Sequence, residues 1–140
     1  MTKPDDLSST RFVEATAEQR NALRRSMLAA RKAIPRNARA QADAAINARL
    51  RNILSGIKAP FTIAGYITDG TEPDLTPVLS DALALGNTLC LPRYINAETY
   101  DFAFADSLEF CNAKFGIPEP GPDAPAADLR TLNDAVWLIP

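Results

Sequence analysis

The segment from Phe61 to Tyr94 constrains the fold of this chain more than any other part of the sequence. It contains an apolar run, a polar turn with two acids, a short stretch of helical apolar periodicity that ends at Gly86, and a second apolar run. This order predicts strand, loop, helix and strand, a unit that joins parallel strands through a right-handed crossover. The sequence therefore predicts an α/β domain with a mostly parallel sheet flanked by helices.

Two acidic residues follow the first apolar run of this segment. Glu72 and Asp74 lie in a polar turn that also contains Asp69-Gly70, a dipeptide typical of tight turns. In α/β proteins, the groups that bind ligands lie just beyond the carboxyl ends of the strands. We therefore expect Glu72 and Asp74 to belong to a ligand-binding site.

Apolar periodicity and turn residues predict further elements along the chain. The predicted helices cover residues 17–34, 38–55 and 75–85, and the predicted strands cover 61–67, 88–91, 100–104 and 135–139. The strand at 88–91 is expected to end at Pro92, because proline donates no ladder hydrogen bond. The strand at 61–67 is apolar at both alternating positions, which predicts burial on both faces of the sheet. Residues 115–129 are rich in proline, so this segment is expected to form an ordered or extended loop.

Burial is predicted for one face of the second helix and for the last strand. Apolar residues at helical spacing form that face, namely Ala42, Ile46, Leu50, Ile53 and Leu54. The alanine content and outward arginines of this helix indicate that it only packs. Residues 135–139 form an apolar run that predicts a buried strand, whereas the alternation at 100–104 predicts a half-exposed strand.

Capping residues define the first helix. Thr16 and Gln19 form a capping box at its start, and the helix is expected to stop before Pro35. Its apolar stripe, which we expect to be buried, consists of Leu23, Met27, Ala30 and Ile34.

Arginines lie beside the apolar stripe of the first helix. Arg20, Arg24 and Arg31 follow the same spacing as the stripe, whereas Arg25 and Lys32 point toward water. Two interpretations are open. The arginines extend along the edge of the core and pair with carboxylates, or they bind an anion such as phosphate, which guanidinium groups recognise well.

Composition excludes several classes of protein. The 140 residues are 46% hydrophobic and 23% charged, as expected for one globular domain. No apolar run approaches the roughly 20 residues that span a bilayer, and the polar N-terminus lacks the apolar core of a secretory signal. Cys90 and Cys111 are expected to be reduced structural thiols. We expect a cytoplasmic protein with a disordered or loosely attached tail at 1–16 and a single α/β domain at 17–140.

The absence of histidine and the distribution of charge limit the possible chemistry. Without histidine, Ser-His-Asp and Cys-His mechanisms and the usual zinc sites are excluded. Positive charge concentrates in residues 20–51, where Asp43 is the only acid, whereas acids dominate residues 95–140. Such a basic region binds a polyanion or complements the acidic part of the same chain. The acidic overall balance, with a formal net charge of −2, and the lack of aromatic residues among the arginines argue against nucleic acid binding.

Short motifs run along the chain from about residue 20 to residue 140. They are Arg20-Asn21-Ala22-Leu23-Arg24 in the first helix, Glu72-Pro73-Asp74 in the acidic turn, Leu91-Pro92-Arg93-Tyr94 at a strand end, the aromatic-Gly-Ile-Pro-Glu-Pro turn Phe115–Pro120, and Ile139-Pro140 after the last strand. In order and spacing, these motifs resemble those of the 5-formyltetrahydrofolate cyclo-ligases, also called 5,10-methenyltetrahydrofolate synthetases. The resemblance implies a fold of the NagB/RpiA/CoA-transferase-like type.

The resemblance also implies an activity and a site. Enzymes of this family use Mg-ATP to phosphorylate the N5-formyl oxygen of 5-formyltetrahydrofolate, after which N10 closes the ring and phosphate leaves to give 5,10-methenyltetrahydrofolate. ATP and Mg²⁺ are thus the implied cofactors, and Arg20 and Arg24 are the implied ligands of the ATP phosphates. The implied substrate-binding residues are Glu72, Asp74, Phe115, Gly116 and Glu119. The expected partner is a small-molecule substrate, and neither nucleic acid nor a membrane is expected.

The sequence departs from the family pattern at several positions. Lysine is usual in the family where Arg20 stands, and threonine usually follows the turn acid, where this chain has Leu75 with Thr76 one place later. The Gly-rich loop ending in Gly-Tyr-Tyr-Asp, which cradles phosphates in the family, does not occur in these 140 residues. We therefore expect the domain to be incomplete at its C-terminus and the chain by itself to be inactive or impaired.

Three hypotheses remain open at this point. The chain is the N-terminal part of a cyclo-ligase-like domain, or it is a non-catalytic protein on the same scaffold that binds folate or another anion. A sugar-phosphate isomerase or CoA-transferase relative that shares only the architecture is the third.

Overall fold

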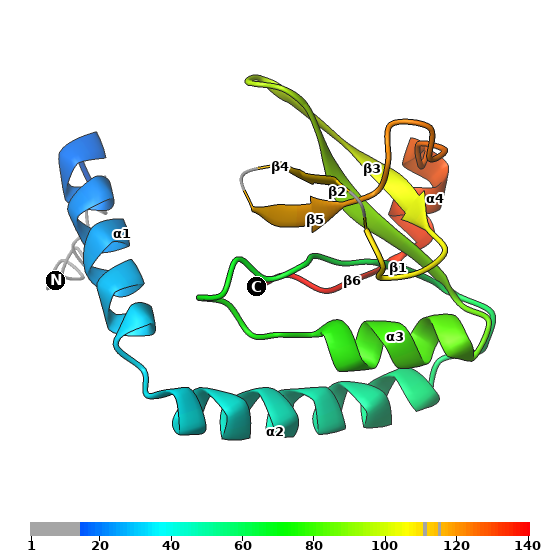
Figure 1. The fold of residues 1–140 in the computed structure, drawn as a ribbon, viewed down its shortest axis with the longest axis horizontal. Helices are drawn as coiled ribbons and strands as arrows, with labels where there is room; N and C mark the ends of the chain where they lie inside the picture. The colour runs from blue at the N-terminus through cyan, green and yellow to red at the C-terminus, as the bar shows by residue number, and fades with distance from the viewer. Residues whose placement is uncertain (1–14, 111, 115) are drawn as a thin grey trace, which may run out of the picture. The chain divides into compact units, whose positions relative to one another are not determined.

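The computed structural model describes residues 15–110, 112–114 and 116–140 (Figure 1). The chain divides into two compact units, one ending at Ala33 and the other covering Ile34–Pro140. The predicted tail lies almost entirely outside the described residues, and so does Cys111.

Helix α1 (Ala17–Lys32) is the described helix of the first unit, and its start confirms the predicted capping box. The Thr16 hydroxyl accepts a hydrogen bond from the Gln19 amide at 3.1 Å, and the Gln19 side chain accepts one from the Thr16 amide at 2.8 Å. The apolar stripe differs from the expectation, because no residue of α1 is buried and Leu23 and Met27 are 63% and 55% exposed. In the described part of this unit, a single helix has no second layer to cover its apolar side.

The second unit is built around a mixed sheet with the strand order β3-β2-β1-β6. The strands are β1 (Thr62–Ala64), β2 (Thr88–Asn96), β3 (Thr99–Ala105) and β6 (Val136–Trp137). Strand β1 pairs in parallel with β2 and with β6, whereas β2 and β3 form an antiparallel hairpin. A separate hairpin joins β4 (Asn112–Lys114) to β5 (Ile117–Glu119), and β5 lies within the segment 115–129 that was expected to be a loop. The predicted α/β class is therefore confirmed, with one antiparallel pairing in the sheet.

Helices cover the sheet and enclose the core. The helices of this unit are α2 (Arg36–Ser55), α3 (Thr76–Ala84) and α4 (Leu129–Asp134). Figure 1 shows α3 between the sheet and α2. The largest fully buried aliphatic side chains come from β1, α3 and β2, and the burial of each is worth about 1.5–3 kcal/mol. They are Ile63, Val78, Leu79, Leu89 and Leu91. The crossover β1-α3-β2 thus forms as the sequence predicted, and Gly86 closes it with a φ of +85°.

The inner face of α2 differs from the predicted apolar face. Leu54 is buried and Ile46 and Leu50 are partly buried, as expected, but Ala42 is exposed and Ile53 is 62% exposed. Asn47, with only 2% exposure, lies inward instead. The inner face therefore carries polar groups that bond to a neighbouring loop, so α2 does more than pack.

Strand β2 continues past Pro92, where the sequence predicted its end. The Gly65 amide donates to the carbonyl oxygen of Cys90, so Cys90 directs its backbone groups toward β1. Residues two apart in a strand direct their backbone groups to the same side, so the Pro92 nitrogen also faces the β1 side. Strand β1 has already ended at Ala64, and the hairpin with β3 loses no hydrogen bond at the proline.

The C-terminal part of the chain differs from the prediction in the exposure of its last strand and in an additional helix. The run 135–139 was expected to be a buried strand, yet β6 spans two residues and Trp137 and Ile139 are 45% and 78% exposed. In the described sheet β6 is the edge strand, so its outer side lacks a cover. Helix α4 was not predicted, although Asp128 caps it by accepting a hydrogen bond from the Thr131 amide at 2.8 Å. This bond also lowers the pKa of Asp128.

No helix in the described part of the chain is long and apolar enough to cross a membrane.

Candidate functional site

A cavity of about 210 Å³ lies beyond the carboxyl ends of β1 and β6. Its lining residues come from the loop after β1, from β2, β3 and β5, and from a position three residues after the end of β6. They are Tyr66, Ile67, Glu72, Leu91, Pro92, Tyr94, Tyr100, Ile117, Pro118, Glu119 and Pro140. This is the edge of the sheet where α/β proteins place ligand-binding groups.

Local turns shape the loop that carries Glu72. The Asp69 carboxylate accepts hydrogen bonds from the Thr71 amide at 2.8 Å and the Thr71 hydroxyl at 2.7 Å, and Gly70 takes a φ of +95°. The Thr68 hydroxyl donates to the carbonyl oxygen of Glu72 at 2.9 Å, which closes the loop on itself. The predicted Asp69-Gly70 turn is thus confirmed, and it sets the backbone position of Glu72.

Polar side chains one turn apart on α2 hold the same loop. Arg39 donates to the carbonyl oxygen of Gly70 at 2.6 Å, and the Asp43 carboxylate accepts from the Asp74 amide at 3.2 Å. Asn47 donates to the carbonyl oxygen of Asp74 at 2.7 Å and accepts from the Val78 amide at 3.0 Å. The spacing i, i+4, i+8 places these three side chains on one face of the helix. Helix α2 therefore anchors the acidic loop and the start of α3.

Tyr66 joins the acidic loop to the cavity. Its hydroxyl donates to the carbonyl oxygen of Pro73 at 2.8 Å. Burial, followed by the negative charges of Glu72, Asp43 and Asp74, raises the pKa of Tyr66 to about 12. The phenol is thus a neutral hydrogen-bond donor at physiological pH.

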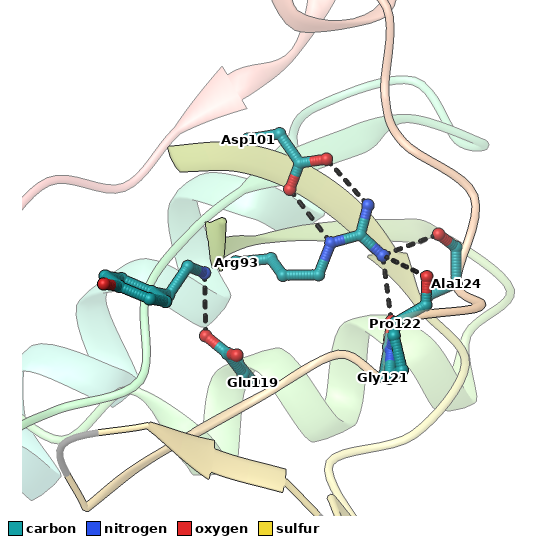
Figure 2. Close-up of polar contacts among 7 residues, drawn as sticks. Arg93, Asp101, Glu119, Gly121, Pro122 and Ala124 are labelled. Carbon is teal, nitrogen blue, oxygen red and sulfur yellow. Dashed lines mark hydrogen bonds and ion pairs between the residues drawn. The ribbon is translucent and has the colours of Figure 1, made fainter. Parts of the chain in front are cut away.

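Glu119 lines the cavity and is bonded to β2 at the residue after Arg93 (Figure 2). The Glu119 carboxylate accepts a hydrogen bond from the Tyr94 amide at 2.9 Å. Arg93 lies directly opposite Asp101 in the β2–β3 register, and its Nε and Nη2 donate to the two Asp101 oxygens at 3.0 and 2.7 Å. The hydrogen bond to Asp101 is the main cause of the raised pKa of Arg93. A fork of this kind is the strong form of an Arg–carboxylate pair.

Aromatic side chains form another part of the wall. Tyr94 and Tyr100 are directly opposite each other in the hairpin, and their rings meet edge to face with centroids 5.5 Å apart. Both line the cavity, so a flat ligand ring can contact an aromatic surface there.

The structure brings together some of the predicted site residues. Glu72 and Glu119 line the same cavity although they lie far apart in the sequence. Asp74 does not line it, because its carboxylate accepts a hydrogen bond from the Thr76 amide at 3.0 Å and its backbone is bonded to α2. Gly116 is the exposed turn residue of the β4–β5 hairpin, with a φ of +76°. Phe115 lies outside the described residues.

Arg20 and Arg24 lie on α1 in the first unit. They are exposed and one turn apart, and Arg24 Nη1 donates to the Asn21 side-chain oxygen at 3.3 Å. Arg20 donates to the carbonyl oxygen of Ala15. Exposed guanidinium groups at this spacing fit phosphate oxygens in type and charge.

Sequence reasoning gave no role to Tyr66, Tyr100 or Arg93. Arg93 follows the predicted end of a strand, where a charge is normally exposed, and only the continuation of β2 past Pro92 shows that it is buried and needs a partner. Its partner Asp101 becomes evident only when the register of the hairpin is known. The tyrosines look like ordinary strand residues in the sequence.

A larger cavity of about 550 Å³ lies elsewhere in the same unit. Apolar side chains such as Leu54, Ile57, Phe61 and Leu85 dominate its lining, with Arg51 and Asp81 also present. Phe61 immediately precedes β1, so this cavity is at the amino end of the strand, away from the usual ligand edge. None of the predicted site residues lines it, and we therefore assign the candidate site to the smaller cavity.

The chemistry of the candidate site follows from its carboxylates and aromatic rings. Glu72 and Glu119 can accept hydrogen bonds from a ligand that presents N–H groups, and the tyrosines can contact its ring. The described residues contain no group of three or more acidic or cysteine side chains that could hold a metal ion by themselves. The chain matches no model of a known protein family and no curated protein.

Proposed function

We propose that this protein is a 5-formyltetrahydrofolate cyclo-ligase, which forms 5,10-methenyltetrahydrofolate from 5-formyltetrahydrofolate at the expense of ATP. One observation carries the proposal: four of the motifs that resemble this family converge on one cavity. Glu72, Tyr94, Glu119 and Pro140 each come from a different motif and all line it. Convergence of distant segments on one concave site supports a common ligand.

The cavity suits the head group of a folate. The aminopyrimidinone ring of a reduced folate presents N–H donors, which the carboxylates of Glu72 and Glu119 can accept, and its flat part can contact Tyr94 and Tyr100. The volume of about 210 Å³ is smaller than the roughly 300–1,000 Å³ typical of sites that enclose a whole ligand. The bicyclic head group would therefore lie inside, and the benzoyl-glutamate part outside.

The residues of α1 are compatible with the cofactor in this proposal. Arg20 and Arg24 are exposed cations one helical turn apart and would bind phosphate oxygens of ATP. ATP supplies the phosphoryl group that activates the formyl oxygen. Because Mg²⁺ is usually bound by phosphates, water and one or two carboxylates, such an ion requires no dedicated cluster of protein ligands. The proposal includes a cytoplasmic location and the NagB/RpiA/CoA-transferase-like architecture, with which the mixed sheet flanked by helices is compatible.

Binding of 5-formyltetrahydrofolate to the 140-residue chain tests the site. We expect isothermal titration calorimetry to detect binding, and we expect Glu119→Gln and Glu72→Gln each to weaken it about tenfold or more, because each removes a charged acceptor. Glu98→Gln is the matched control, since Glu98 is exposed in the β2–β3 turn and does not line the cavity. Absence of binding at about 1 mM ligand, or equal effects of all three variants, would contradict the proposal.

Turnover separates the enzyme from the non-catalytic alternative. With Mg-ATP present, formation of 5,10-methenyltetrahydrofolate is followed by its near-UV absorbance. We expect this signal from a form of the protein that continues into a Gly-rich phosphate loop, and little or none from the 140 residues alone. Binding without turnover in both forms would instead favour a folate-binding protein on this scaffold.

A further inference from the structure

Arg93 is a nearly buried cation whose hydrogen bonds extend beyond Asp101. It is 8% exposed, and its Nη1 donates to the carbonyl oxygens of Gly121 at 2.9 Å, Ala124 at 2.8 Å and Pro122 at 3.4 Å. Figure 2 shows these carbonyl groups gathered on one side of the guanidinium and the Asp101 carboxylate on the other. A buried charge is costly unless it is paired and hydrogen-bonded, and here both conditions are met.

The segment that Arg93 holds follows Glu119 directly. Prolines interrupt this segment, so it has few backbone donors with which to form a regular ladder. Its far end joins the edge of β3, where the Phe104 amide donates to the carbonyl oxygen of Pro125 at 2.9 Å and the Ala127 amide donates to that of Phe102 at 2.7 Å. Between this edge and β5, a bond from the Ala124 amide to the Gly121 carbonyl oxygen at 3.1 Å forms a turn, and the contacts with Arg93 tie this turn to β2.

Glu119 is held from β2 at the neighbouring residue. Its carboxylate accepts from the amide of Tyr94, while the side chain of Arg93 bonds to the backbone two to five residues further along the loop. Consecutive residues of one strand thus fix Glu119 and the segment after it. Glu119 itself pairs with Asn112 in the β4–β5 hairpin, so release of the loop would loosen one end of β5 and leave the carboxylate less firmly held in the cavity.

We propose that Arg93 is a positioning residue, which keeps Glu119 in the cavity by clamping the carbonyl groups of residues 121–124. The identity of the ligand in this inference rests on the proposed function, whereas the clamp itself does not. Lysine at position 93 keeps the charge but has no planar fork, so it cannot bond to Asp101 and to the loop in the same way. Arg93→Lys therefore isolates the clamp from the charge.

The first test needs no ligand. In Arg93→Lys, hydrogen exchange of the Tyr94 amide, measured by NMR, is expected to become at least about tenfold faster, because its acceptor on Glu119 is no longer held in place. The Val78 amide, bonded to Asn47 in another part of the unit, is the internal control and should keep its protection. Should Arg93→Lys also deprotect Val78, Asp101→Asn replaces it as the milder variant. An unchanged Tyr94 exchange rate in a folded variant would overturn the inference.

The second test uses affinity for 5-formyltetrahydrofolate in a double-mutant cycle. If Arg93 acts through Glu119, the double variant Arg93→Lys/Glu119→Gln binds no more weakly than Glu119→Gln alone. With Glu72→Gln, which changes a cavity residue from the loop after β1, the fold-changes should multiply. Multiplication in both pairs would show a general structural effect and would overturn the inference. If wild type binds no folate but Arg93→Lys speeds Tyr94 exchange, the proposed function fails and the clamp is still supported.

Discussion

Asn47 offers the sharpest test of how the acidic loop is held. It is 2% exposed, and its amide group donates to the carbonyl oxygens of Asp43 at 2.8 Å and Asp74 at 2.7 Å while accepting from the Val78 amide at 3.0 Å. Asn47→Ala leaves the Asp74 carbonyl and the Val78 amide without this partner. At about 1–3 kcal/mol for each unsatisfied buried group, and with some relief by water, we expect a loss of about 3 kcal/mol in unfolding free energy.

Asn47→Asp has the same shape and reverses the electrostatics. The new carboxylate would face the carbonyl oxygens of Asp43 and Asp74, so only its bond from the Val78 amide would remain favourable. An uncompensated buried charge costs about 3–5 kcal/mol, so Asn47→Asp should destabilise more than Asn47→Ala at pH 7. Because protonation removes the charge, the loss should shrink as the pH falls toward about 4.

Urea unfolding followed by far-UV circular dichroism measures both losses. The matched control is Asn52, which is exposed on the same helix, and Asn52→Asp should cost less than about 1 kcal/mol. An Asn47→Asp variant no less stable than Asn52→Asp would refute the reasoning. So would a loss that is independent of pH.

Further predictions concern a titration, a backbone conformation and the cofactor. Tyr66 ionises near its ordinary pKa of 10.0 in the unfolded chain but at about 12 in the folded chain, so the free energy of unfolding falls as the pH rises between these values. In urea unfolding, the stability advantage of wild type over Tyr66→Phe should therefore shrink by about 2–3 kcal/mol across this range. Parallel pH profiles of the two proteins would contradict this. Gly86→Ala should lower the unfolding free energy by about 1 kcal/mol, because φ is +85° there, even though the added Cβ would meet open space. Gly56 has a φ of −83°, so Gly56→Ala should be neutral or stabilising in the same assay. Arg24→Ala should weaken binding of Mg-ATP in calorimetry, whereas Arg25→Ala, about 100° further around α1, should not. Equal affinities of the two variants would return Arg24 to a structural role.

Much of the fold could be predicted because its signals are local. The capping box at Thr16, the turn at Asp69-Gly70 and the helix stop at Gly86 each depend on residues within a few positions, and each occurs as expected. The class of the domain follows from the order of apolar runs between 61 and 94. The exposed side of β6 could not be predicted, because an apolar run has the same sequence pattern in a central strand as at an edge.

The sequence by itself determined the elements of the crossover and placed Glu72 beyond the end of β1. Only the tertiary structure decided that Glu119 shares its cavity, that Asp74 is bonded to α2 instead, and that Arg93 holds the proline-rich segment. The physical reason is the range of the interactions involved. Caps and turns are decided by neighbours in the chain, whereas the partners of Glu119 and Arg93 depend on the register of β2 with β3 and on the position of β5.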